Sequence, residues 1–248
     1  SRGLGDVYKR QDKNDGKYSK NYTNVTVSNR YLNREARFYN TVFFNGRQWP
    51  VTCKQVQFYN GGNAGVQEGQ ATTTGYMLFK RFNRSISKTS PGVASQNRPS
   101  IIFRLADFYL IYAEVANEVN PSDSRVLTYL NLVRERAGLP KVEILNPGIV
   151  GNKELQRAAI QRERQIELAT EGQRYFDVRR WMIADKDGEG RQNGYAHGMN
   201  VRGTINDTEE FNRVVETEKI VFNRKMYLQP IPDHEMRKTQ NLVQNPGW

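Results

Sequence analysis

Apolar residues between positions 101 and 184 recur at three- and four-residue intervals, which is the spacing of one face of an α-helix. The first run ends at Asn120-Pro121-Ser122, which stops one helix and starts the next. A second run continues to Gly138-Leu139-Pro140, a glycine C-cap followed by a helix breaker. We expect the buried face of the first helix to comprise Leu105, Phe108, Tyr109, Tyr112, Val115, Ala116 and Val119.

These two helices, antiparallel and joined by a short turn, match one tetratricopeptide-like unit of about 34 residues. One such unit cannot bury its own apolar face, because neighbouring repeats normally supply the other half of the core. A single copy is visible in the sequence. We therefore expect further units to be missing or supplied elsewhere, which would leave a large apolar helix face exposed.

Later segments predict two more helices and some irregular structure. One helix is expected from Lys153 to Thr170, with Asn152 as its N-cap and Gly172 closing it, and another from Gln173 to about Ala184. Four aromatic residues at helical spacing are expected in the core: Tyr109, Tyr112, Phe176 and Trp181. Beyond them we expect a loop over 185–208, a hairpin over 219–228 and a last short helix capped by Asp233.

The first hundred residues are rich in Asn, Gly, Thr and Tyr and predict short strands and loops. Residues 41–44 form an apolar run before Asn45-Gly46, the strongest short signal for a hairpin turn. A short helix over 33–39, strands over 51–59 and 76–82, and a glycine-rich loop over 60–65 are also expected. The chain is thus predicted to be mainly α-helical, with loop-rich segments and short β-hairpins.

The charge balance is basic but does not favour nucleic acid. The 248 residues carry 37 Lys and Arg against 26 Asp and Glu, a net charge of +11. The densest basic cluster, over 157–180, is interleaved with acidic residues, whereas a nucleic-acid face needs an unopposed stripe with aromatic platforms. Net charge by itself affects solubility and electrostatic steering rather than fold.

Several local features bear on cellular context. No apolar run approaches the roughly 20 residues needed to cross a bilayer, and residues 1–30 contain no signal-peptide core. The one cysteine, Cys53, excludes an intrachain disulfide and follows no apolar run that would mark a lipid-attachment site. Residues 1–11 have no structural periodicity and look like a translated, non-native adaptor scar, which implies that the natural N-terminus is missing.

Three glutamates, Glu163, Glu167 and Glu171, stand at i, i+4 and i+8 on one helix face, where like charges repel. One interpretation is a carboxylate pair for glycoside hydrolysis. The other is a buried ion network that fixes helix packing, for which bidentate arginine is well suited. We favour the ion network, because catalytic carboxylates usually lie at strand ends or in cleft loops. Arginines are available for it at Arg104, Arg134, Arg136, Arg174, Arg179 and Arg180.

We find no constellation for catalysis, metal binding or a cofactor. His197 and His234 lack a second His or Cys at ligand spacing, and Cys53 has no evident base. The glycines over 61–65 lack the spacing and the lysine of a phosphate-binding loop. We therefore predict no cofactor and no enzymatic activity.

Loop aromatics next to amides suit glycans, because sugar rings stack on aromatic planes while amide groups take the hydroxyls. The chain holds 13 Tyr, 11 Phe and 3 Trp. The candidate ligand-binding residues in predicted loops and turns are Tyr18, Tyr22, Trp49, Tyr59, Asn60 and Asn63.

Six segments in order resemble the SusD/RagB family. Residues 33–46 look like its Asp-Pro-Arg-Phe-Tyr segment, with Glu35-Ala36 in place of Asp-Pro. The tail Asn241–Trp248 ends on Pro-Gly-Trp, a rigid aromatic terminus that can be pinned into a groove. The other similar segments are 74–81, 104–118, 132–140 and 162–181, and the sixth runs from 227–232 through this tail.

The resemblance implies a SusD-like fold and an outer-membrane lipoprotein of Bacteroidetes that delivers oligosaccharide, less often peptide, to a SusC-like TonB-dependent transporter. A full member is roughly twice this length, so the chain is expected to be a C-terminal portion without the anchor. Residues 12–100 would form a ligand-side segment and residues 101–248 a helical scaffold. The alternatives are a glycoside hydrolase using the helix carboxylates, and a peptide-binding or protein-interaction scaffold.

Overall fold

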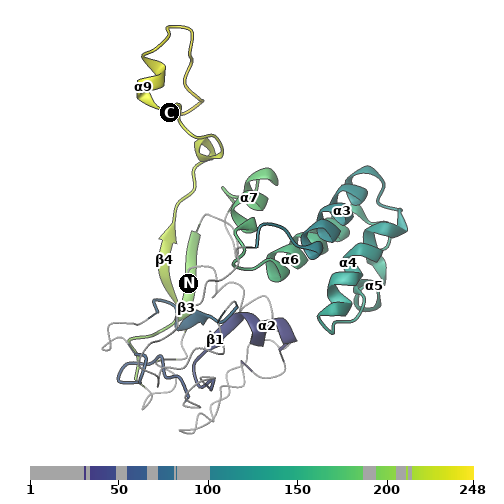
Figure 1. The fold of residues 1–248 in the computed structure, drawn as a ribbon, viewed down its shortest axis with the longest axis vertical. Coiled ribbons are helices and arrows are strands. Elements are labelled where there is room, and N and C mark those ends of the chain that lie inside the picture. Colours follow the sequence, from purple (N-terminus) through teal and green to yellow (C-terminus); the bar gives the residue numbers. More distant parts are fainter. Residues whose placement is uncertain are drawn as a thin grey trace.

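The structure, a computed structural model, is mainly α-helical, as predicted, and the residues that it describes form two small sheets (Figure 1). The predicted scar over 1–11, Tyr18, Tyr22, Trp49 and Cys53 lie outside the residues that it describes. It describes residues 31, 34–48, 55–65, 72–80, 82, 101–186, 194–204, 211 and 214–248.

The helical part is built on a three-helix arrangement. Helices α3 (Leu105–Val119) and α4 (Ser124–Arg136) form the predicted antiparallel pair, and α6 (Lys153–Glu167) packs against both. Short elements complete this part: α5 (Val142–Leu145), η3 (Pro147–Ile149) and α7 (Gln173–Arg180). Within the described part of the chain, no helix combines the length and apolar character needed to cross a membrane.

Capping residues explain where these helices begin. The Asn152 side chain accepts a hydrogen bond from the Leu155 N–H, as its predicted N-cap position requires. Asp123 does the same for α4 through the Arg125 N–H, so this helix begins after Asp123 and not in the Pro121 turn. The helix predicted over 153–170 ends at Glu167, and the one predicted to reach Ala184 ends at Arg180.

The buried face of α3 differs from the predicted one. Leu110 and Ala113 pack against α4 and α6, around Leu130 and Ile160. Both sides of α3 carry apolar residues at helical spacing, so the spacing alone does not identify the buried side. The exposed residues of the predicted face are Leu105, Phe108, Tyr112, Val115 and Val119; Phe176 of α7, also predicted as core, is exposed as well.

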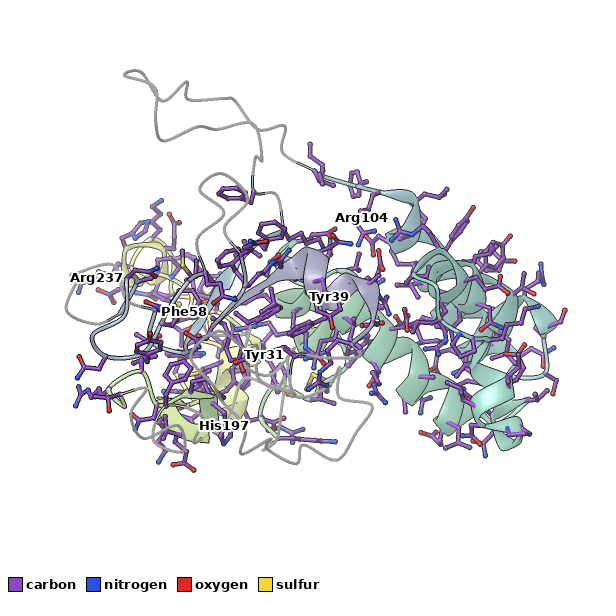
Figure 2. The ribbon with its side chains drawn as sticks, turned by 90° about the horizontal axis from the view of Figure 1, so that it is seen from below. Tyr31, Tyr39, Phe58, Arg104, His197 and Arg237 are labelled. Atoms are coloured by element: carbon purple, nitrogen blue, oxygen red, sulfur yellow. The ribbon has the colours of Figure 1, made fainter. Side chains whose placement is uncertain are left out.

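A second core is aromatic and lies beside the helices. Helix α2 (Ala36–Thr41) leads into β1 (Val42–Phe44), which pairs antiparallel with β2 (Tyr76–Leu78) so that Phe43 faces Met77. Figure 2 shows Tyr31, Tyr39 and Phe58 within this part of the molecule and Arg104 at its boundary with the helices. The buried members of this aromatic core include Tyr31, Phe38, Phe43, Phe44, Phe58, Tyr59, Tyr76, Phe79 and Phe211.

The predicted strands need correction. The turn at Asn45-Gly46 is followed by a bridge between Gln48 and Gln55. Of the strand predicted over 51–59, residues 56–59 are irregular, as is the loop over 60–65. The strand predicted over 76–82 ends at Leu78. The loop predicted over 185–208 contains β3 (Gly194–Met199). Its antiparallel partner is β4 (Val214–Ile220), so no hairpin forms over 219–228. Glycine is needed in β3, because a Cβ on Gly198 would lie 2.6 Å from the Thr74 Cα.

The C-terminal segment extends away from the sheets (Figure 1) and contains η4 (Arg224–Tyr227) and α9 (Asp233–Met236). A small apolar cluster ties its beginning to the end of α7 through Val178, Ala184 and Phe222. The Trp248 Nε1–H donates to the backbone carbonyls of Lys225 (3.1 Å) and Leu228 (3.0 Å). The aromatic terminus is therefore fixed against η4.

Candidate functional site

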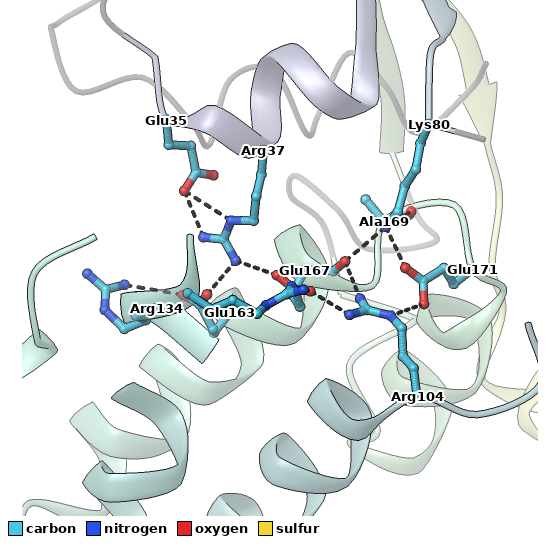
Figure 3. A network of polar contacts seen from close by, with 10 residues as sticks. Glu35, Arg37, Lys80, Arg104, Arg134, Glu163, Glu167, Ala169 and Glu171 are labelled. Carbon is cyan, nitrogen blue, oxygen red and sulfur yellow. Dashed lines mark hydrogen bonds and ion pairs between the residues drawn. The ribbon is translucent and has the colours of Figure 1, made fainter. Parts of the chain in front are cut away.

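The three glutamates of the predicted stack meet five cations at the junction of the aromatic core and the helices (Figure 3). Glu163 accepts from Arg37 of α2 (2.5 Å) and Arg134 of α4 (3.2 Å). Glu167 accepts from Arg37 (3.0 Å), Arg104 (2.6 Å) and Arg136. Each carboxylate thus joins α6 to at least one other element.

Glu171 continues the network just beyond the end of α6. Its carboxylate contacts Lys80 (2.5 Å) and Arg104 (2.6 Å). The Lys80 ammonium also donates to the backbone carbonyls of Glu167 (3.0 Å) and Ala169 (3.1 Å), which the helix end leaves without intrahelical partners. Lys80 therefore holds the segment after β2 onto the C-terminal end of α6.

The network is largely dry, since the side chains of Glu163 and Glu167 are each 3% exposed. Burial acts to raise the pKa of Glu167, but hydrogen bonds from Arg104 and Arg37 outweigh it and hold that pKa below its ordinary value. Burial lowers the pKa of Lys80, and the contact of its ammonium with Glu171 offsets part of this shift. The Glu167 carboxylate is thus held in its ionised form.

This geometry bears on the two interpretations of the glutamate stack. A glycosidase needs one carboxylic acid with a raised pKa and a second carboxylate with room for substrate between them. Glu167 has a lowered pKa, and every carboxylate of the stack is bound by arginine or lysine. The arrangement is that of an ion network joining α2, α3, α4 and α6.

The arginines expected to reach the stack behave differently from one another. Arg104, Arg134 and Arg136 contact it. Arg174 lies over the Trp181 ring, 5.7 Å from its centroid. Arg180 pairs with Glu114 and Asp177 instead.

Sequence reasoning missed Arg37 and Lys80, which approach the stack from the aromatic side. The separation of 126 residues between Arg37 and Glu163 means that no spacing rule connects them. The available signal was the unbalanced charge of the stack itself, which requires cations from elsewhere.

A second, more deeply buried ion cluster is formed by Arg164 of α6 with side chains of α3 and α7. The Arg164 guanidinium contacts Asp107 of α3 (2.8 Å) and Asp177 of α7 (3.0 Å), and all three side chains are buried. Arg180 adds a contact to Asp177 (2.8 Å) and also binds Glu114. This cluster fixes α7 against α3 and α6.

Of the candidate ligand-binding residues, the structure brings Tyr59, Asn60 and Asn63 together in one tight loop. The Tyr59 ring is buried against Phe211, and this burial raises the pKa of its hydroxyl. The Asn63 side chain accepts from the Gln57 N–H and donates to the Gln55 carbonyl. These interactions shape the loop, and the partly exposed Asn60 is bound through its backbone N–H to the Gly203 carbonyl.

Two hollows border the ion network. One of about 350 Å³ lies beside Glu167 and Glu171, between α2 and the end of α4. A larger groove of about 590 Å³ runs along α5 and α6 and has mostly apolar walls. Its polar lining residues are Glu35, Arg37, Arg134, Asn146, Arg162 and Glu163. Both volumes fall in the general range of ligand pockets, about 300–1,000 Å³.

The two histidines lie apart. His197 is partly buried in β3, at a register shift next to Ala196, and the exposed His234 contacts Glu235 (3.1 Å). Within the described ranges, no group of three His, Cys, Asp or Glu side chains is arranged to hold a metal ion.

Comparison with known proteins places this arrangement in a family. The chain is 44% identical over 106 residues to SusD-like protein P25 of Formosa agariphila, an alignment covering 43% of this chain and 19% of the relative. It is 31% identical over 153 residues to SusD-like protein P2 of the same organism, covering 60% of this chain and 26% of the relative. The chain therefore spans about a quarter or less of these relatives.

A solved structure of a SusD-like carbohydrate-binding protein from Bacteroides fragilis is also similar. It superimposes with a TM-score of 0.70 at 25% identity, over 96% of this chain and 47% of that protein. Residues 3–248 of the chain match the model of the SusD family. The chain therefore belongs to the SusD family.

Proposed function

We propose that this chain is the glycan-binding part of an outer-membrane nutrient-uptake system, and that it delivers oligosaccharide to a SusC-like TonB-dependent transporter without altering it. The observation that carries the proposal is the family match over residues 3–248, together with the carbohydrate-binding character of the similar Bacteroides fragilis protein. In this proposal the complete protein is a lipid-anchored component of the outer membrane on its extracellular face.

The proposal assigns ligand capture to the loop-rich segment 12–100. Asn60 supports this, since the loop around it is fixed by Asn63 and its own side chain is partly exposed. A fixed loop loses little conformational freedom on binding, and weak, loop-based contacts would still permit release to the transporter.

The apolar side of α3 supports the transporter contact. Phe103, Phe108 and Val115 lie exposed along one stretch of the chain, and Val119 is 81% exposed. Contiguous exposed apolar surface is typical of protein–protein contact sites. We assign this face of the repeat-like helices to packing against the transporter or against further repeats.

Calorimetric titration of the chain with a panel of neutral and charged oligosaccharides tests the proposal. We expect at least one ligand to bind with a dissociation constant in the micromolar range, which corresponds to a binding free energy of about −8 kcal/mol. Asn60→Ala is expected to weaken that binding, whereas the matched change Asn241→Ala in the exposed tail leaves it unchanged. Absence of binding across the whole panel would contradict the proposal.

A further inference from the structure

A cationic cleft lies at the C-terminal end of the molecule, away from the ion network. It has a volume of about 780 Å³ and opens between the end of α7, η4 and the Pro246-Gly247 turn. Its accessible walls are mostly apolar, its cations are Arg179, Arg180, Arg224 and Lys225, and no carboxylate side chain is among its lining residues in the described chain. Such a surface attracts anions.

Two of the four cations are fixed by internal contacts. Arg180 pairs with Glu114 and Asp177. Arg179 lies 3.4 Å above the centroid of the Tyr175 ring and donates to the Tyr175 carbonyl. Their guanidinium groups therefore form a wall that does not need to reorganise when a ligand enters.

The other two cations, Arg224 and Lys225, make no ion pair with a carboxylate of the described residues. Asp185 lies close enough to Arg224 for their charges to interact, but its carboxylate accepts a hydrogen bond from the Tyr227 hydroxyl (2.6 Å). Arg224 and Lys225 therefore remain available to an incoming anion.

The Pro-Gly-Trp terminus builds one wall of this cleft. Gly247 has a φ of +88°, a backbone conformation that favours glycine, and a Cβ there would lie in tight contact, 3.0 Å from the Lys225 Cβ. The Lys225 ammonium lies 4.3 Å from the Trp248 ring centroid, and the tryptophan is 44% exposed. Trp248 is not among the lining residues, so the cleft has cations in its wall and a partly exposed aromatic ring beside it.

We propose that this cleft binds the anionic group of an acidic oligosaccharide, the carboxylate of a uronic acid or a sulfate ester, while the Trp248 ring contacts the sugar. Arginine donates to carboxylate or sulfate oxygens in pairs, and aromatic faces suit pyranose rings. The cleft is far larger than one inorganic anion needs and has the size of a small-ligand site. The net charge of +11 would steer such ligands to the protein. The inference rests on the proposed glycan-binding function and adds to it a second site, apart from the loop around Asn60, with a stated ligand class.

Calorimetric titration of the 248-residue chain with matched ligands tests this inference. The ligands are trigalacturonate, its methyl ester, a sulfated galactan trisaccharide, its unsulfated counterpart and inorganic phosphate. We expect the two charged sugars to bind at least tenfold more tightly than their neutral counterparts, and the difference to shrink as salt is raised. Phosphate is expected to compete only weakly.

Matched variants locate the binding. Arg224→Gln and Lys225→Met are each expected to weaken the binding of trigalacturonate about fivefold to tenfold. Arg202→Gln removes the same charge from an exposed position that does not line the cleft, and is expected to leave affinity within about twofold.

The outcomes separate the inference from the proposed function. Equal binding of charged and neutral sugars, or unchanged affinity in both cleft variants, would overturn the cleft assignment while leaving the glycan-binding proposal standing. Phosphate binding as tight as that of the charged sugars would overturn the saccharide assignment. Binding of no sugar of either class would count against both.

Discussion

Replacement of Glu167 by alanine is expected to lower the free energy of unfolding by about 3 kcal/mol. The Glu167 carboxylate is buried and accepts from Arg37, Arg104 and Arg136, so its removal leaves the largely buried Arg37 and Arg104 without one of their counterions, while Arg136 is exposed to solvent. Urea unfolding followed by circular dichroism measures the change. Glu154→Ala is the matched control on the same helix, because that glutamate is 75% exposed and should contribute less than about 0.5 kcal/mol.

The pH dependence gives this prediction a second readout. The pKa of Glu167 is lowered in the folded state, so its contribution is fully present above the unfolded pKa of about 4.3 and is lost as pH falls through the folded value. The stability difference between wild type and Glu167→Ala should therefore shrink as pH is lowered from about 7 to about 3. A difference that stays constant over that range would show that Glu167 acts by packing rather than by charge.

Replacement of Arg164 by leucine is expected to cost about 3–5 kcal/mol, the largest effect of any single ion-pair change among the described residues. Leucine leaves Asp107 without its arginine contact. Asp177 loses its contact with the buried Arg164 and keeps the one with the more exposed Arg180. The thermal midpoint and the urea midpoint should both fall. Arg157→Leu is the control, since Arg157 lies on the same helix in a more exposed ion network and should cost less than about 1 kcal/mol.

A double-mutant cycle distinguishes charge from shape in this cluster. Adding Asp107→Asn to Arg164→Leu removes one uncompensated buried charge, so it should recover part of the lost stability. If the double variant is less stable than Arg164→Leu by the full cost of Asp107→Asn alone, the two residues do not interact and the cluster does not have the assigned role.

Local signals predicted the helices well, because capping chemistry and glycine stops act over a few residues. Asn152 was identifiable as a cap from its position before an amphipathic run, and the structure has its side chain on the Leu155 N–H. The strands were harder. The segment over 194–199 contains two glycines and a histidine and lacks apolar alternation, and its pairing with residues 214–220 is decided by tertiary contacts.

The orientation of α3 shows where periodicity fails. This helix is apolar around much of its circumference, so the residues with the largest apolar side chains suggested the wrong buried face. The side that packs carries the small Ala113 together with polar Asp107 and Asn117. Those two are tolerated inside because Asp107 accepts from Arg164 and Asn117 donates to the Lys153 carbonyl.

The candidate site was predictable in part. The charge of the glutamate stack indicated that cations must lie nearby. That these cations include Arg37 and Lys80 could not be predicted, because their positions depend on how α2 and the segment after β2 pack against α6. Tyr59 illustrates the opposite case: an aromatic residue next to a glycine-rich loop suggested a sugar-stacking position, and the structure buries its ring against Phe211. Sequence spacing does not reveal which loop aromatic points inward.

The ion network also has a consequence for function. It joins the aromatic part, which contains the candidate ligand loop, to the helices that we assign to the transporter contact. Buried ion pairs fix orientation more than they add stability. Ligand capture and transporter docking would therefore occur on parts of the molecule held at a set angle to each other.

The glutamates at positions 163, 167 and 171 hold the fold together, and we propose that the protein leaves a bound glycan intact. The most direct test is mass spectrometry of the tightest-binding oligosaccharide after prolonged incubation with excess protein, together with a reducing-end assay. We expect recovery of the ligand at its original length with no new reducing ends. Shorter products that disappear in Glu163→Gln while that variant stays folded would contradict this proposal.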